Sequence, residues 1–216
     1  MQILANIVVL TSLYALVASG YVLVYKVSRV LNLAHGELMI LGAYLLVATS
    51  AGIASDPLAA IAITAMFSIV VGLSVYLLLM RKMTGQPVLA AVLTTVALGI
   101  LLRGAMVLIW GPQQLNAAAM ISFDNASIAL TDSVRVSTAA LWLVVCTFLV
   151  YLGLLAFLHM SRWGMRMRAS GQNALLAAQR GINLHTVYAL AWTLSTFSGS
   201  LAGVLVTLDS RIDVNM

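Results

Sequence analysis

The sequence predicts an all-α fold, a polytopic bundle of transmembrane helices, and three observations support that prediction. Of the 216 residues, 62% are hydrophobic and only 8% are charged, whereas soluble domains are about 25% charged. Long apolar runs recur along the chain, each close to the ~20 residues that cross ~30 Å of hydrocarbon. The alternating polarity that a transmembrane β-barrel needs is absent, and helices satisfy their own backbone groups in lipid.

The apolar runs predict six spans. No linker rich in Pro, Ser or Gly divides the chain, so we expect residues 1–216 to form a single transmembrane domain. The expected spans are residues 3–25, 36–53, 58–80, 88–110, 138–158 and 186–208. The first run lacks the positively charged start of a cleavable signal peptide, so we expect this span to be retained.

The segment from His159 to His185 sets the expected orientation, because it is basic and holds no acidic residue. Its arginines are Arg162, Arg166, Arg168 and Arg180. Short loops rich in Lys and Arg stay in the cytoplasm. If residues 159–185 form a cytoplasmic loop, the alternation of spans places four other basic residues on the same side, namely Lys26, Arg29, Arg81 and Lys82.

The opposite side then receives mainly acidic residues. They are Asp56, Asp124, Asp132, Asp209 and Asp213, beside Arg135 and Arg211. The bias has the same sign at every loop, and loops this short are the ones that the rule governs. We therefore expect both ends of this chain to lie outside the cell membrane.

A polar run from Asn32 to Glu37 lies between the first two spans. Asn32 is a good N-cap, and Glu37 near the first turn suits the positive end of a helix dipole. The same run, with His35 and Gly36, is also typical of an interrupted helix, which membranes tolerate only where it contacts protein or a water-filled cavity. A buried Glu37 would need a partner, and His35 would not face it on a regular helix. These four residues are candidates for a substrate pathway.

Arg103 is the charged residue that lies well inside an expected span, the fourth. Its side chain either extends to the outer interface, as long basic side chains do, or it faces a cavity. In the second case it would pair with a carboxylate, from Glu37 or from a passing substrate. The second interpretation adds Arg103 to the candidate pathway.

The sixth expected span carries a stripe of small residues. Ala191, Ser195, Gly199 and Gly203 recur at every fourth position, and the last two have the GxxxG spacing. This spacing lets helix backbones approach closely. We expect Ser195, Gly199 and Gly203 to form a tight helix-packing seam, with a pore wall as the alternative.

Signatures of catalysis and of metal binding are not found. The three histidines lack the HExxH spacing of a zinc site, and no GxxxxGK[ST] phosphate loop occurs. The single Cys146 permits neither an internal disulfide nor a zinc cluster. An intramembrane serine protease built on Ser198 is disfavoured because Thr196 replaces the Gly of a GxSG element. We expect no enzyme activity, no cofactor on this chain and no nucleic-acid partner.

Short motifs along the whole chain carry a family resemblance. They are Gly20–Tyr25, Val30–Glu37 with its Asn-x-Ala-His-Gly-Glu run, Leu41–Tyr44, Trp110–Pro112, Gly164–Ala169, Ala177–Asn183 and Ser200–Val204. Together they resemble the permease subunits of branched-chain amino acid ATP-binding-cassette importers. Lys26 and Arg29 stand where family members more often carry Gly or apolar residues. Relatives commonly continue beyond the position of Met216, so we expect a chain truncated at its C-terminus.

The resemblance implies a bacterial inner-membrane importer built from several chains, with both ends of this chain in the periplasm. A periplasmic solute-binding protein would deliver the amino acid, and two permease subunits, identical or homologous, would form the pathway. Separate ATP-binding subunits would drive it from the cytoplasm. Urea and short amides are alternative cargoes, because very similar permeases carry them. The rival of another class is a secondary transporter that works without an ATPase.

The resemblance also implies that the segment around Ala177–Asn183 is the coupling helix that contacts the ATPase. Residues Asn173 to Arg180 fit a short helix, and Gly181 fits its stop. The candidate coupling residues are Arg166, Arg168, Ala177, Gly181, Ile182 and Asn183. Arginines offer bidentate contacts to acidic groups of a partner, and the same side chains are suited to the phosphates of membrane lipid.

Overall fold

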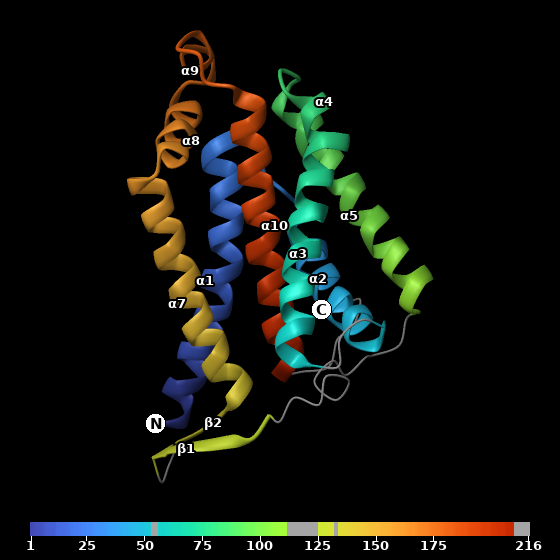
Figure 1. The fold of residues 1–216 in the computed structure, drawn as a ribbon, viewed down its shortest axis with the longest axis vertical. Helices are drawn as coiled ribbons and strands as arrows, with labels where there is room; N and C mark the ends of the chain where they lie inside the picture. The colour runs from blue at the N-terminus through green and yellow to red at the C-terminus, as the bar shows by residue number, and fades with distance from the viewer. Residues whose placement is uncertain (53–55, 112–124, 132–133, 210–216) are drawn as a thin grey trace.

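The computed structural model describes residues 1–52, 56–111, 125–131 and 134–209, and most of these are helical (Figure 1). This confirms the all-α, polytopic prediction. The elements are α1 (Gln2–Ser28), α2 (His35–Gly52), α3 (Pro57–Val75), the π-helical turn η1 (Tyr76–Met80), α4 (Arg81–Met83), α5 (Val88–Trp110), β1 (Ser127–Thr131), β2 (Val134–Ser137), α7 (Thr138–Met160), α8 (Arg162–Gln172), α9 (Ala174–Gln179) and α10 (Leu184–Asp209). Several residues used in the sequence argument lie outside the described ranges, namely Pro112, Asp124, Asp132, Arg211 and Asp213.

Five helices in the described part of the chain are long and apolar enough to cross a membrane. They are α1, α5, α7, α10 and the helix that continues from α3 through η1 to Met83. α2 is a shorter apolar helix. α3 begins at Pro57 because the Oδ2 atom of Asp56 accepts a hydrogen bond from the N–H of Ala59 at 3.0 Å, and Pro suits the first helical position.

α10 lies at the centre of the bundle and packs against α1, α2 and α3. In the most apolar 18-residue stretch of α10, 61% of the residues are buried. The corresponding value for α7, which lies at the periphery, is 11%. Small residues make this central position possible. A Cβ atom on Gly203 would strike the main-chain oxygen of Met39 in α2, and one on Gly42 would strike Ser200. The backbones of α2 and α10 therefore touch, which is a close approach typical of membrane helices.

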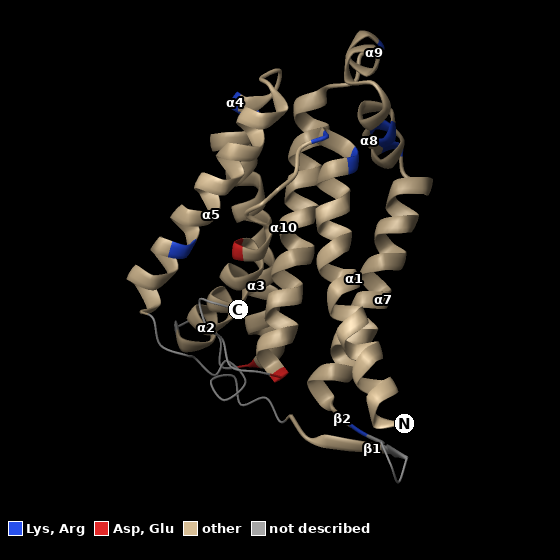
Figure 2. Ribbon diagram, turned by 180° about the vertical axis from the view of Figure 1, so that it is seen from behind, with Lys and Arg blue, Asp and Glu red and all other residues tan. Residues whose placement is uncertain are grey.

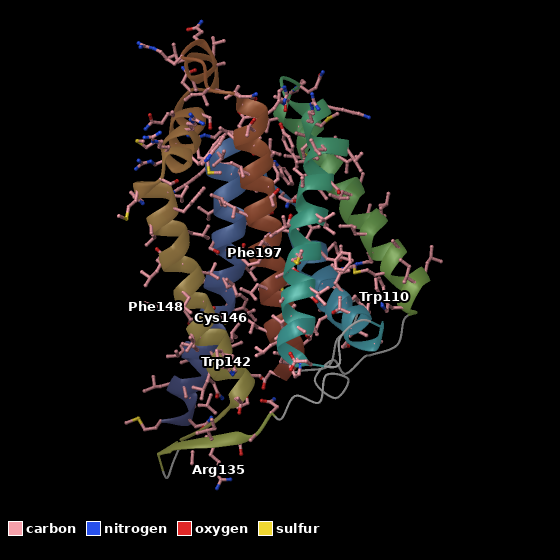
Figure 3. The ribbon with its side chains drawn as sticks, viewed as in Figure 1. Trp110, Arg135, Trp142, Cys146, Phe148 and Phe197 are labelled. Carbon is pink, nitrogen blue, oxygen red and sulfur yellow. The ribbon has the colours of Figure 1, made fainter. Side chains whose placement is uncertain are left out.

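Apolar side chains surround this contact and also cover the outside of the bundle. Leu16, Tyr44 and Leu205 belong to one buried cluster around α10, and Leu38, Tyr76 and Trp192 belong to another. The outer side of α7 exposes Trp142 and Phe148 (Figure 3). A helix with this much exposed apolar surface fits a lipid environment, where apolar side chains lose nothing by staying on the outside.

A β-hairpin lies between α5 and α7, where the sequence predicted no secondary structure. β1 and β2 pair antiparallel, with Ser127 opposite Ser137. The side chain of Gln2 in α1 donates to the Arg135 carbonyl oxygen and accepts from its N–H, both at 2.8 Å. Ser137 donates to Asp209 at the end of α10, at 2.6 Å. The hairpin thus ties the start of α1 to the end of α10.

Basic and acidic residues separate along the bundle. Lys and Arg gather at the end that carries α4 and α8, and the acidic ends of α3 and α10 lie at the opposite end (Figure 2). Arg135 lies on the hairpin, at the acidic end (Figure 3). The basic loops on which the charge argument depends therefore share one end of the molecule.

Candidate functional site

The chain between α1 and α2 turns back into the bundle. α1 ends because Arg29 adopts a left-handed conformation with φ 58°, and its N–H bonds to the carbonyl oxygen of Tyr25 at 3.0 Å. Residues 30–34 are not helical, and α2 begins at His35. This start lies beside Val17 and Ser195, which are well inside α1 and α10. α2 is therefore an interrupted helix that starts within the bundle.

Two buried polar residues hold this break. The Oγ1 atom of Thr95 in α5 accepts a hydrogen bond from the N–H of Leu33 at 3.1 Å and donates to the carbonyl oxygen of Val92 at 2.7 Å. The Oδ1 atom of Asn32 accepts from the N–H of Ala34 at 3.2 Å. Asn32 thus stabilises the turn that precedes α2, slightly earlier than the expected N-cap. Thr95 was not predicted, because its role depends on a contact with another helix.

His35 is locked between α1 and α10. Its Nε2 atom lies 3.2 Å from the carbonyl oxygen of Val17, and its Nδ1 atom lies 3.4 Å from the Oγ atom of Ser195. Gly20 and Gly199 leave the space for the ring, because a Cβ atom on them would lie 2.8 Å and 2.9 Å from it. His35 therefore anchors the start of α2, and the small-residue stripe of α10 provides part of its slot.

Glu37 faces α5, away from these contacts. Its Oε1 atom lies 2.9 Å from the Nη2 atom of Arg103. The Glu37 side chain is 17% exposed and that of Arg103 is 48% exposed. The second carboxylate oxygen of Glu37, Oε2, is buried and has no hydrogen-bond partner within the described structure. Of the two interpretations of Arg103, the structure shows the pair with Glu37.

The face beside this pair is open. Gly36 is exposed, and a Cβ atom placed on it would meet nothing within 4 Å. The exposed start of a helix near the middle of a transmembrane bundle cannot face lipid, because lipid offers its backbone groups no partners. This face therefore needs water or further protein as its neighbour. Asn32, His35, Gly36, Glu37 and Arg103 are thus brought together, with His35 facing inward and Glu37 toward α5.

The basic end carries a second set of predicted residues, on α8 and α9. α8 is fixed to α1, because Arg29 donates from Nε to the carbonyl oxygen of Gly171 at 2.9 Å. A side chain on Gly171 would strike the main-chain oxygen of Lys26. Arg166 lies over the ring of Trp163 at 4.6 Å, and Arg168 is exposed. These arginines are presented outward on a helix that packs closely against α1.

α9 is a short helix closed at both ends. The Oδ1 atom of Asn173 accepts from the N–H of Leu176 at 3.0 Å. At the other end Gly181 has φ 81°, and the N–H of Ile182 bonds to the carbonyl oxygen of Ala177 at 3.1 Å. This is the Schellman pattern, which needs a glycine at the left-handed position. The expected helix from Asn173 and its glycine stop are both present.

Two of the candidate coupling residues, Ala177 and Asn183, do not present their side chains to a partner. Ala177 is buried, and the Oδ1 atom of Asn183 accepts from the N–H of Thr186 at the start of α10. These two residues shape the segment. The side chains that α9 presents are instead Leu175 and Leu176, which are 69% and 57% exposed. Sequence analysis missed this pair, although two adjacent leucines in a polar loop were a signal of a contact surface.

A cavity of about 340 Å³ lies next to α9. It separates α9 and α10 from η1 and from the turn at residues 84–86, and Leu175, Tyr188 and Trp192 line it. Its wall is mostly apolar. Among the described residues, no three His, Cys, Asp or Glu side chains are grouped to hold a metal ion.

Comparison with known proteins adds an independent observation. The family model described as the permease component of branched-chain amino acid transport systems matches residues 3–215. The chain belongs to this family. The match confirms the resemblance seen in the motifs, because it spans both the break before α2 and the α8–α9 connection.

Individual permeases of this family are similar to the chain over most of its length. It is 27% identical over 217 residues to the high-affinity branched-chain amino acid transport system permease protein LivH of Salmonella typhimurium. It is 28% identical to LivH of Escherichia coli and to BraD of Pseudomonas aeruginosa, over 221 and 218 residues. Each alignment covers 95% of this chain and 70% of the relative. No solved structure matches the chain.

Proposed function

We propose that this chain is the membrane subunit of an ATP-binding-cassette importer that carries branched-chain or related amino acids into the cell. The observation that supports this assignment most is the tip of α9. Leu175 and Leu176 are exposed beside Arg180, on a helix that lies outside the membrane-spanning segments and is fixed at both ends. Exposed apolar side chains with a polar rim mark protein contacts, and a separate ATP-binding subunit is the partner proposed for them.

The geometry gives such a partner a mechanical path into the bundle. α9 passes directly into α10 through Asn183, which caps the first turn of α10. In that turn, the Nδ1 atom of His185 lies 3.0 Å from the hydroxyl of Tyr76 in η1. Because α10 also packs on α1, α2 and α3, a displacement of α9 would be transmitted to the break before α2. Arg166 and Arg168 would add ionic contacts to the ATPase.

The proposed pathway follows the open face at Gly36, with Glu37 and Arg103 along it and Asn32 and His35 supporting it. A second permease subunit, identical or homologous, would cover this face and leave a water-filled passage. The periplasmic solute-binding protein would dock at the end that carries the β-hairpin. The chain would then lie in a bacterial inner membrane with both of its ends in the periplasm, and Trp163 and Arg162 on α8 would meet lipid at the cytoplasmic surface.

The test is co-purification with the ATP-binding subunits encoded with this chain. We expect the amount of ATPase that co-purifies with the double variant Leu175→Glu, Leu176→Glu to fall by about tenfold or more, as it does when a central apolar contact is removed. Gln179→Glu, an exposed change on the same helix, should leave the complex intact. Full retention of the ATPase by the double variant would contradict the proposal.

Uptake measurements separate the rivals. Proteoliposomes with the complete complex should accumulate labelled leucine only with ATP and the binding protein, and valine or isoleucine should compete. Competition by urea or acetamide alone would assign the alternative cargo. Accumulation driven by an ion gradient without the ATPase would favour the secondary transporter, which needs intramembrane ionisable groups such as Glu37 and Arg103.

A further inference from the structure

We propose that the Glu37–Arg103 pair is the subsite for the charged end of a zwitterionic α-amino acid. Arg103 would bind the α-carboxylate and Glu37 the α-ammonium group, so that the bound amino acid separates the two side chains. This inference rests on the proposed function. It names the two residues that would recognise the charged groups of the cargo.

The position of the pair supports a site on a passage. Glu37 lies two residues after His35, whose ring contacts the middle of α1 and α10. Arg103 is 48% exposed although it lies within the apolar helix α5. A half-exposed guanidinium and the open start of α2 at Gly36 lie on a surface that lipid cannot cover without a large cost. Water or further protein must therefore reach the pair.

The chemistry of the two groups matches both charges of an amino acid. A guanidinium has five N–H donors, and the described ion pair uses Nη2 for a single carboxylate oxygen. The exposed part of Arg103 can bind an incoming carboxylate in a bidentate manner. Glu37 has one oxygen in the pair and a second, Oε2, that is buried without a partner. When a carboxylate displaces Glu37 from Arg103, the freed Oε1 becomes an acceptor for the ammonium group.

Charge balance explains why a zwitterion fits and other cargoes do not. The closed pair carries no net charge, and a zwitterion inserted between its members replaces one ion pair by two. The site therefore stays neutral at every stage. A cargo with only a carboxylate would leave Glu37 unpaired, and one with only an ammonium group would leave Arg103 unpaired, within the membrane. Urea and simple amides offer neither charge, so they cannot open the pair in this way.

The experiment uses the assembled permease and ATP-binding subunits in nanodiscs, without the solute-binding protein. It measures equilibrium binding of labelled leucine. Two competitors separate the charges: leucinamide lacks the carboxylate, and 4-methylpentanoate lacks the ammonium group. For the wild type we expect each competitor to be at least about tenfold weaker than leucine. Arg103→Gln should abolish the difference between leucine and leucinamide, and Glu37→Gln the difference between leucine and 4-methylpentanoate.

Two further variants keep the test independent of folding. The double variant Glu37→Gln, Arg103→Gln leaves no unpaired charge in the bundle, so it should still assemble with the ATPase but lose preference for the zwitterion. Arg103→Lys keeps the charge but not the bidentate geometry, so it should retain part of the discrimination that Arg103→Gln abolishes. The proposal is overturned if the assembled variants discriminate as the wild type does, or if the wild type binds no leucine or binds all three compounds equally. Failure of the proposed function would instead appear as a wild type without ATP-dependent uptake.

Discussion

Thr95 and Asn32 show at the residue scale how a membrane bundle can hold a non-helical segment. The N–H of Leu33 bonds to Thr95 in a neighbouring helix, and the N–H of Ala34 bonds to the Asn32 side chain. Both side chains are buried. Backbone groups that lack helical partners are costly in a membrane unless protein groups replace them. The break before α2 therefore depends on a small number of specific hydrogen bonds.

Substitution of Thr95 tests this dependence. Thr95→Val keeps the shape but leaves the N–H of Leu33 without its partner, and we expect it to lower the free energy of unfolding by about 1–3 kcal/mol. The thermal unfolding midpoint of the purified protein in detergent measures the effect, and leucine uptake should fall as well. Thr94→Val is the matched control, because within the described residues the Thr94 hydroxyl bonds only to the carbonyl oxygen of Ala90 in its own helix. Equal midpoints for the two variants would contradict the account.

Part of this site was predictable from the sequence. Asn32, His35, Gly36 and Glu37 interrupt an apolar pattern and were therefore predicted, and a buried Glu37 was expected to need a partner. The choice of Arg103 as that partner remained open, because pairing depends on where α2 starts relative to α5. The starting point of α2 within the bundle is set by the left-handed Arg29 and by Thr95. Neither residue produces a periodic pattern in the sequence.

At the scale of elements, α10 organises the bundle through small residues. Sequence analysis expected a packing seam at Ser195, Gly199 and Gly203, and it could not name the partner helices. In the structure the partners are α1 and α2, with the ring of His35 against Gly199 and the backbone of Met39 against Gly203. Spacing identifies a face of a helix, but the partner depends on the path of the whole chain.

Gly203→Ala tests the close approach of α2 and α10. The new Cβ atom would strike the Met39 carbonyl oxygen, which is main chain and cannot rotate away. We expect a destabilisation of about 1–3 kcal/mol, as overpacking in a core causes, seen as a lower yield of monodisperse protein after heating. Gly153→Ala in α7 is the control, since a Cβ atom there meets nothing within 4 Å. If both variants tolerate heat equally, the two backbones are not in contact.

Long apolar helices were the elements that the sequence predicted best, because crossing hydrocarbon constrains both their length and their composition. The hairpin of β1 and β2 was missed. Its strands have five and four residues, and they owe their place to Gln2 and Asp209 at distant points of the chain. η1 was missed as well, because a π-helical turn changes the backbone without changing the apolar pattern.

At the scale of the whole molecule, charge divides the bundle into two ends. The ends of α1 and α4 and all of α8 form the basic end, and Asp56 and Asp209 lie at the other (Figure 2). The sequence predicted this division correctly for the described residues, because the loops between consecutive spans must lie on alternate sides of the membrane. The proposed importer requires one further step, that the basic end with α8 and α9 faces the cytoplasm, where an ATPase can bind it.

Cysteine labelling of intact cells tests that step most directly. In a Cys146→Ser background, Gln172→Cys places an exposed thiol on α8 and Ser127→Cys places one on the hairpin. With a membrane-impermeant maleimide, we expect Ser127→Cys to react in intact cells and Gln172→Cys to react only after the inner membrane is disrupted. Reaction of Gln172→Cys in intact cells, with protection of Ser127→Cys, would place α8 and α9 outside and leave the proposed ATPase without a surface to bind.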